Sequence, residues 1–348
     1  MAQKKEVKLG VFEKYLTLWI AVCIIIGLLL GRFLPGFGQY LDSLRFAQLP
    51  IPIGVCLFFM MYPTVVQIKF GDVAKAMKNP KPLLLTVIAN WVINPPLATL
   101  LANTVLPGHP EFVAGIILLG ISPCTAMVMW WIMLAKGDLG QGLVNTAVNA
   151  LLMVFLYAPL AAFYLGVSAI PVPWDLIALS VLFFIVVPVI SASISRWVVI
   201  NRRGQEWFDR DYVPRLAKIS IVALLITLIV MFSLEGDIII NQPLTVALIA
   251  VPLLLGYAIM ISLTYVVSWL ANWSYESSIC NTLIGSSSHF EVAIAVATTL
   301  APSIGSGAAL ATVIGPLMEV PLMLSLVRLG LRTRHLFPRN KGKVKTKF

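Results

Sequence analysis

A cysteine that follows a proline lies inside a stretch of the sequence that is otherwise apolar enough to cross a membrane. Residues 120–131 read GISPCTAMVMWW. Proline removes a backbone donor and clashes with the preceding turn, so a membrane helix breaks or kinks here unless other groups satisfy the freed backbone. Unpaired backbone donors at such a break could stabilise the thiolate of Cys124, which is the form that binds soft ions. Cys124 is therefore the first candidate ligand, with Ser122 and Thr125 as its polar neighbours.

A second polar stretch, SSSHFE at residues 286–291, interrupts another apolar segment. An ionisable side chain is costly in hydrocarbon unless it faces a cavity or a partner, so Glu291 is the candidate for carrying a proton. The alternative is a carboxylate that reaches the membrane interface. His289 could share the proton of Glu291, or it could only hydrogen-bond to serines such as Ser288. The sequence leaves both interpretations of His289 open.

Two further polar side chains lie deep in apolar segments. Glu319 stands between Pro316 and Pro321, where it could join a transport site or only satisfy carbonyl groups that the prolines leave free. Asn149 could line the same cavity, although polar residues in lipid often do no more than pair helices. The other cysteines are expected to be packing residues outside any disulfide framework: Cys23, Cys56 and Cys280.

The composition indicates a membrane protein. Hydrophobic residues make up 59% of the 348 positions and charged residues 11%, whereas about a quarter of the residues in soluble domains are charged. A spanning helix needs about 20 apolar residues. Ten spans are predicted near 15–34, 51–69, 82–106, 112–135, 141–166, 174–199, 214–234, 244–271, 275–300 and 305–330. The first run is too long for a secretory signal and lacks its cleavage site, so we expect an uncleaved helix in an all-α integral membrane protein.

The distribution of basic residues sets the expected orientation. With a cytoplasmic amino terminus, all but two of the 25 Lys and Arg residues lie in cytoplasmic segments, and the exceptions are Arg32 and Arg45. This asymmetry follows the positive-inside rule, so both termini are predicted to be cytoplasmic and the protein to lie in the cell membrane. The net charge of +10 is interpreted as a topology signal and as contact with anionic lipid, without a role in nucleic-acid binding.

Ten spans with both ends on one side divide into two halves of five, which would be inverted in the membrane. The motif GISPCTAMV (120–128) has a counterpart in GSSSHFEVA (285–293), and LYAP in the fifth span has one in MEVP in the tenth. We therefore predict two repeats, 1–166 and 167–348, with broken helices in spans four and nine. Paired broken helices at matching places point to a transport site, because half-helix ends offer free backbone groups to a solute.

At these residues the chain resembles the ten-helix arsenical-resistance permeases, arsenite exporters within the bile acid:sodium symporter superfamily. The resemblance covers nearly the whole chain and is strongest at PCTAMVMWWIMLAKGD (123–138) and SSHFEVAIAVATTLAPSIGSGAALATVIGPLMEVP (287–321). In that family the cysteine before an Ala-Met-Val run and the glutamate after a phenylalanine are functional, and they match Cys124 and Glu291. The resemblance implies export of arsenite or antimonite in exchange for protons, with the metalloid on Cys124. It also implies six helices in a core and four in a panel that rock against each other.

The chain departs from the family pattern close to these residues. Family members usually have Ala-Arg, a single asparagine and Asn-Asn at the places where this chain has Ser122-Pro123, Ile132 and Ser288-His289. The oligomeric state is not determined by the sequence.

Two other functions are alternatives. Sodium-coupled importers of organic anions in the same superfamily resemble one another in a Glu-x-Gly-x-Gln-Asn stretch at the span-nine break, where this chain has IGSSSH (284–289). Ile284 has no side-chain oxygen for sodium, although other oxygens could hold the ion. A membrane-embedded enzyme or channel is the second alternative. The sequence has no Walker-type glycine loop, His-Glu-x-x-His motif or nucleophile elbow, so neither catalysis nor a cofactor is expected.

Overall fold

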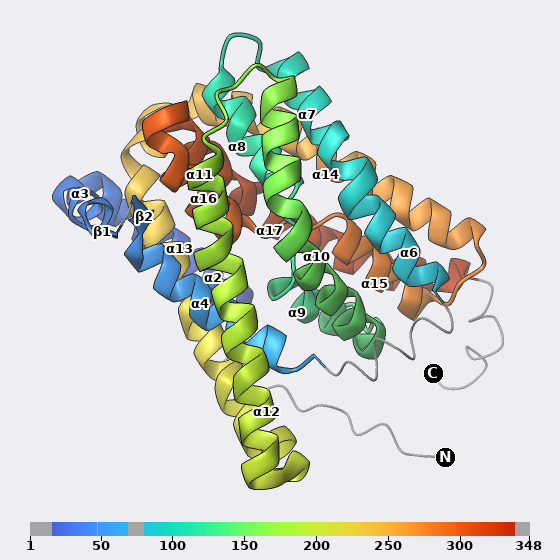
Figure 1. Ribbon diagram of the computed structural model, residues 1–348. Coiled ribbons are helices and arrows are strands. Elements are labelled where there is room, and N and C mark those ends of the chain that lie inside the picture. Colours follow the sequence, from blue (N-terminus) through green and yellow to red (C-terminus); the bar gives the residue numbers. More distant parts are fainter. Residues whose placement is uncertain (1–15, 47, 69–79, 338–348) are drawn as a thin grey trace.

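The computed structural model describes residues 16–46, 48–68 and 80–337 of the chain. These residues are almost entirely helical, with one two-stranded hairpin (Figure 1). Most of the predicted basic segments at the amino end, in the connection before Lys81 and after Phe337 lie outside the described residues.

The elements alternate long helices with short interruptions. The first half contains α2 (Leu16–Phe33), α3 (Pro35–Ser43), β1 (Arg45–Phe46), β2 (Leu49–Pro50), α4 (Ile51–Val66), α6 (Lys81–Ile88), the π-helical turn η1 (Ala89–Ile93), α7 (Asn94–Val105), α8 (Pro110–Gly120), α9 (Met127–Leu134) and α10 (Leu139–Val167). The second half contains α11 (Trp174–Val181), η2 (Leu182–Val186), α12 (Val187–Trp207), η3 (Phe208–Tyr212), α13 (Val213–Asn241), α14 (Pro243–Leu270), α15 (Tyr275–Gly285), α16 (Phe290–Ile304), α17 (Gly307–Thr333) and η4 (Arg334–Leu336).

In the described part of the chain, six helical stretches are long and apolar enough to cross a membrane: Leu16–Phe33, Lys81–Val105, Leu139–Val167, Trp174–Asn241, Pro243–Leu270 and Gly307–Leu336. Three shorter apolar helices accompany them: Ile51–Val66, Pro110–Gly120 and Phe290–Ile304. The chain is therefore an all-α membrane protein, as predicted. Each of the ten predicted ranges contains helix. A kink at Gly204 (φ 81°, ψ 162°) separates 174–199 from 214–234, while 112–135 and 275–300 are each divided in two.

The connection between the first two predicted spans has structure that the sequence analysis did not predict. It forms α3 and then an antiparallel hairpin in which Arg45 pairs with Pro50. The two glycines within PGFGQYLDS lower the helix propensity of α3, so its formation depends on tertiary contact. A Cβ atom at Gly38 would lie 2.9 Å from the carbonyl oxygen of Ser233, so glycine permits the close approach of α3 to α13.

The helices form two groups that lie side by side (Figure 1). In the first group, which we call the panel, α2 and α4 pack against α13, and α4 also packs against α12. In the second group, which we call the core, α8 packs against α7, α16 and α17, while α14 packs against α7, α15 and α17. The remaining core helices α6, α9 and α10 contact α15. The broken helices therefore lie within the core.

The helices α2 and α4 run in opposite directions between two ends of the molecule, and so do α9 and α10. Leu16, Gln67, Met133, Leu139 and Ala217 line one common cavity, so α2, α10 and α13 begin where α4 and α9 end. We call this the basic end, because most Lys and Arg residues belong to the segments next to it. The opposite end, which we call the far end, carries Arg32 and Arg45.

Candidate functional site

The two broken helices meet through the extended segments that interrupt them. α8 and α9 are separated by residues 121–126, and α15 and α16 by residues 286–289. These segments run antiparallel to each other, and Pro123 and Ser288 form the bridge between them. We call this the crossing.

Backbone hydrogen bonds join the two segments in a reciprocal way. The N–H of Cys124 donates to the carbonyl oxygen of Ser287 at 3.2 Å, and the N–H of His289 donates to that of Ser122 at 2.6 Å. In the alignment of the two sequence motifs, Ser122 corresponds to Ser287 and Cys124 to His289. Each hydrogen bond is therefore the counterpart of the other. The two breaks satisfy part of each other's freed backbone, which lipid could not do.

Cys124 is 2% exposed and lies just before the first turn of α9. The backbone N–H groups of Val128 and Ala126 donate toward its sulfur, and the charged groups that act on it are the carboxylates of Glu319 and Glu291. Backbone amide donors at the start of α9 thus point to the thiol, and the stabilisation of a thiolate by them stays a prediction. All four cysteines of the chain are free, and Cys124 is the one that lies in a segment of the crossing.

His289 and Glu291 form a buried pair at the start of α16. Nδ1 of His289 lies 2.9 Å from Oε2 of Glu291, and the two residues are 1% and 2% exposed. The structure places the two side chains next to each other, and the sharing of a proton between them stays a prediction. Within the described residues, neither Nδ1 nor Nε2 of His289 has a hydrogen-bond partner, so the 2.9 Å contact with Glu291 is an approach without hydrogen-bond geometry.

Glu319 is fully buried and accepts hydrogen bonds at the crossing. The backbone N–H of Ser288 lies 3.2 Å from each carboxylate oxygen, and the hydroxyl of Tyr257 donates to Oε2 at 3.0 Å. The partners of Glu319 are therefore donors from α14 and from the break, in place of the proline-freed carbonyl groups that the sequence analysis considered. Tyr257 was missed by the sequence analysis, although a buried tyrosine hydroxyl needs a partner and so gives a signal.

The other predicted residues are buried but differ in their contacts. The hydroxyl of Ser122 donates to the carbonyl of Leu118 at 2.7 Å, and that of Thr125 has no partner in the described structure. Asn149 accepts a hydrogen bond from Nε1 of Trp91 at 3.1 Å. The structure thus brings Ser122, Cys124, Ser288, His289, Glu291 and Glu319 to the crossing. Asn149 is instead joined to the α6–α7 helix pair.

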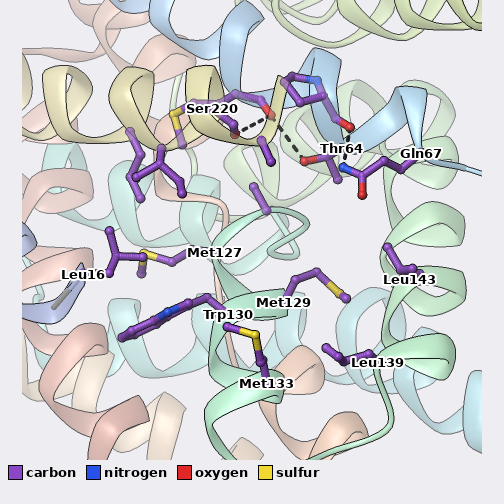
Figure 2. A pocket seen from close by; sticks show the side chains of 16 residues that line it. Leu16, Thr64, Gln67, Met127, Met129, Trp130, Met133, Leu139, Leu143 and Ser220 are labelled. Atoms are coloured by element: carbon purple, nitrogen blue, oxygen red, sulfur yellow. Dashed lines mark hydrogen bonds between the residues drawn. The ribbon is translucent and has the colours of Figure 1, made fainter. Parts of the chain in front are cut away.

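A cavity of about 340 Å³ lies between the panel and the core at the basic end (Figure 2). Thr64 and Ser220 line it from the panel, and Trp130 lines it from the core. Met127, at the start of α9, is also part of the lining, so the cavity reaches the helix turn that follows Cys124. None of the described lining side chains is charged.

Comparison with known proteins gives consistent matches over the chain. Residues 54–242 match the model of the sodium bile acid symporter family. The chain is 45% identical to an uncharacterized transporter of Synechocystis sp. over 96% of its own length and 92% of that protein. It is 39% identical to the arsenical-resistance protein Acr3 of Alkaliphilus metalliredigens over 95% of each chain. It is also 32% identical to the arsenical-resistance protein Acr3 of Corynebacterium glutamicum, over 93% of this chain and 90% of the relative.

Proposed function

Because the chain belongs to the sodium bile acid symporter family, we propose that it is a secondary transporter that exports trivalent arsenic or antimony hydroxide across the cell membrane. Two relatives are arsenical-resistance proteins by name, which favours a metalloid solute. Protons are the proposed coupling ion, and they enter in exchange for the metalloid. Neither a catalytic reaction nor a resident cofactor is part of the proposal.

The observation that carries the proposal is one buried thiol at the crossing, beside two carboxylates. A neutral arsenic trihydroxide can bind such a thiol reversibly. An S–As bond forms, an As–O bond breaks, and the thiol proton leaves with the hydroxide as water. Among the described residues, no three His, Cys, Asp or Glu side chains converge as a metal site. A lone soft ligand such as Cys124 can release the metalloid, whereas several thiolates would hold it too tightly.

The cavity favours a neutral solute. Arsenic and antimony trihydroxides carry no charge at physiological pH, and the described lining of the cavity has no charged side chain. Thr64, Gln67 and Ser220 each donate to a carbonyl group of α4, so their oxygen atoms are what the panel side offers as acceptors to the solute's hydroxyl groups (Figure 2). An organic anion would gain no charged partner along this wall, which argues against the organic-anion importer.

The proton is assigned to Glu291. In the proposed cycle the metalloid moves outward on Cys124 and Glu291 carries the proton on the return movement, with His289, 2.9 Å away, sharing that proton. Ser122, Thr125 and Ser288 would hydrogen-bond the hydroxyl groups of the metalloid. Glu319 would hold the second break in shape, and Asn149 would support the surrounding helices.

The proposed architecture consists of ten spans in two inverted repeats, 1–166 and 167–348, with both termini cytoplasmic. The reciprocal hydrogen bonds at the crossing and the opposite directions within the pairs α2–α4 and α9–α10 support this proposal. The basic end would then face the cytoplasm. The cavity at that end would admit the metalloid, and rocking of the panel against the core would expose the crossing to the outside.

Transport into inside-out membrane vesicles tests the function. We expect arsenite and antimonite to accumulate under an acid-inside pH gradient, equally with and without sodium. The same vesicles carrying Cys124→Ser are expected to show no uptake. A strict requirement for sodium would favour the organic-anion importer, and uptake that continues after the pH gradient is collapsed would favour a channel.

A further inference from the structure

The two ends of the boundary between panel and core differ. At the basic end the cavity separates α4 and α13 from α9 and α10. At the far end the core helix α16 packs against the panel helix α4, against β2, which leads into α4, and against α11, which continues through η2 into α12. The structure therefore has a closed far end, and the contacts there must open if the crossing is to face the other side of the membrane.

Arg45 makes a polar contact across this closed end. Its Nη1 donates to the backbone carbonyl of Thr298 in α16 at 3.0 Å, while Nη2 bonds the carboxylate of Asp42. Its Nε donates to the backbone carbonyl of Asp42 at 3.0 Å. In residues 16–46, 48–68 and 80–337, no other side-chain hydrogen bond joins the panel to the core.

The accepting carbonyl is free for a reason that is visible in the sequence. In an α-helix the carbonyl of residue 298 would accept from the N–H of residue 302. Residue 302 is a proline inside α16 and has no N–H. The carbonyl of Thr298 therefore lacks its helical donor, and Thr298 is 4% exposed, so water does not replace that donor freely. Arg45 supplies the missing donor.

The bond acts on the helix that carries the proposed proton site. Thr298 lies seven residues after Glu291 in α16, which is about 10 Å along the helix axis. Asp42 holds the other side of the guanidinium on the panel. A movement of α16 away from the hairpin would break the bond to Thr298 and leave the bond to Asp42 intact.

We propose that Arg45 is a positioning residue that holds the far end closed, by joining the panel to the proline-freed carbonyl of Thr298. We call this contact the latch. The proposal rests on the proposed transport function, because it assigns Arg45 a part in alternating access. Loss of the latch favours the conformation in which the crossing faces the far end.

Arg32 provides a matched control. It is the other arginine of the far end, and its Nη1 lies 2.9 Å from Oδ1 of Asp237. That pair joins α2 to α13, which both belong to the panel. Substitution of Arg32 therefore removes one positive charge from the far end, as substitution of Arg45 does, but it changes no contact between the panel and the core.

The test measures access to Cys124 from the far end. In the parent variant Cys23, Cys56 and Cys280 are replaced by alanine, which leaves Cys124 as the thiol of the chain. Right-side-out vesicles are treated with membrane-impermeant methanethiosulfonates, one cationic and one anionic, and modification is followed by mass spectrometry. We expect Arg45→Gln to raise the rate of modification about fivefold with both reagents, because one hydrogen bond of the closed state is lost.

Pro302→Ala gives a second, independent variant. It restores an N–H for the carbonyl of Thr298, so it is expected to raise the rate as Arg45→Gln does. The double variant should add little to either single change, since both act on one bond. Arg32→Gln is expected to leave the rate unchanged.

The latch proposal is overturned if Cys124 is modified at the parent rate in Arg45→Gln. It is also overturned if Arg32→Gln raises the rate of modification as much as Arg45→Gln does. It is also overturned if no variant is labelled in vesicles while the detergent-solubilised parent is. The labelling needs no metalloid, so the two proposals can fail separately. Faster modification of Cys124 in Arg45→Gln, without arsenite transport in the parent, would support the latch and contradict arsenite as the solute. Proton-driven arsenite transport with an unchanged rate of modification would support arsenite as the solute and contradict the latch.

Discussion

At the centre of the crossing Pro123 faces Ser288. Ser288 has a backbone N–H donor and Pro123 has none. The N–H of Ser288 donates a hydrogen bond to the buried carboxylate of Glu319. Pro123 needs no acceptor, and the residue that corresponds to Glu319 in the other motif is Tyr157. The half that has the backbone donor thus has a carboxylate that accepts its hydrogen bond. The half that lacks the donor has a neutral tyrosine at the corresponding position.

The same difference extends to the chemistry of the two breaks. The break between α8 and α9 carries the thiol of Cys124, and no titratable side chain other than this thiol lies in 121–126. The break between α15 and α16 carries His289 and leads directly into Glu291. The backbone pairing is reciprocal, yet the thiol belongs to the first half and the groups proposed to carry the proton belong to the second. We infer that the two halves divide metalloid binding from proton coupling.

Removal of the thiol should have the largest effect. Cys124→Ser keeps the shape of the first break but loses the soft ligand, so metalloid resistance is expected to fall to the level of cells without the transporter. The matched control replaces Cys23, Cys56 and Cys280 together and should retain most resistance. Growth on arsenite, with immunoblots of membrane fractions, makes the comparison. Full resistance in Cys124→Ser would return this cysteine to a packing role.

Removal of the charge at the second break should abolish coupling. Glu291→Gln mimics a permanently protonated side chain, so uptake driven by a pH gradient should be lost while metalloid binding persists. The measurement is arsenite uptake into inside-out vesicles with and without the gradient. Wild-type uptake under the gradient would show that Glu291 is not the proton carrier.

The support of the second break should contribute mainly to stability. Tyr257→Phe removes a donor from the buried carboxylate of Glu319 and should cost about 1 kcal/mol, or up to about 3 if the carboxylate stays unpaired. Glu319→Gln should likewise lower the yield of folded protein more than the transport per molecule. Thermal melting of detergent-solubilised protein and uptake normalised to protein amount separate the two effects. A loss of uptake without a loss of stability would move Glu319 into the transport site.

The smallest effect is expected at His289. His289→Asn removes the imidazole that contacts Glu291 but leaves the backbone bond to Ser122 intact. Uptake should fall by no more than about threefold while its dependence on pH changes, because the proton remains on Glu291. Uptake rates measured across a series of external pH values test this. An unchanged pH profile would indicate that His289 only packs against Glu291.

The sequence predicted the parts of this fold that depend on local chemistry. Prolines and polar residues in apolar runs marked both breaks, and Cys124 and Glu291 are buried near each other as expected. The helix α3 and the hairpin before α4 could not be predicted, because α3 packs against α13 and β2 packs against α16, both far away in the sequence. The hydrogen bond from Arg45 to Thr298 could be predicted only in part. Pro302 shows that the carbonyl of Thr298 lacks a helical donor, but the sequence does not show that Arg45 reaches it.

The contacts of other candidates depended on packing that no local pattern specifies. Asn149 could equally have faced the cavity, but it accepts from Trp91. The donors that reach Glu319 come from Tyr257 in α14 and from Ser288 in the second break, both distant from Glu319 in the sequence. The cavity at the basic end follows from the position of the panel relative to the core, which hydrophobic periodicity does not determine.

Binding of radioactive arsenite to purified protein tests the division between the two breaks most directly. Wild-type protein, Cys124→Ser and Glu291→Gln would be compared in the same detergent at a fixed pH. The account predicts that Cys124→Ser loses binding, while Glu291→Gln retains binding despite its loss of proton-driven transport. Retained binding in Cys124→Ser, or an equal loss of binding in both variants, would contradict it.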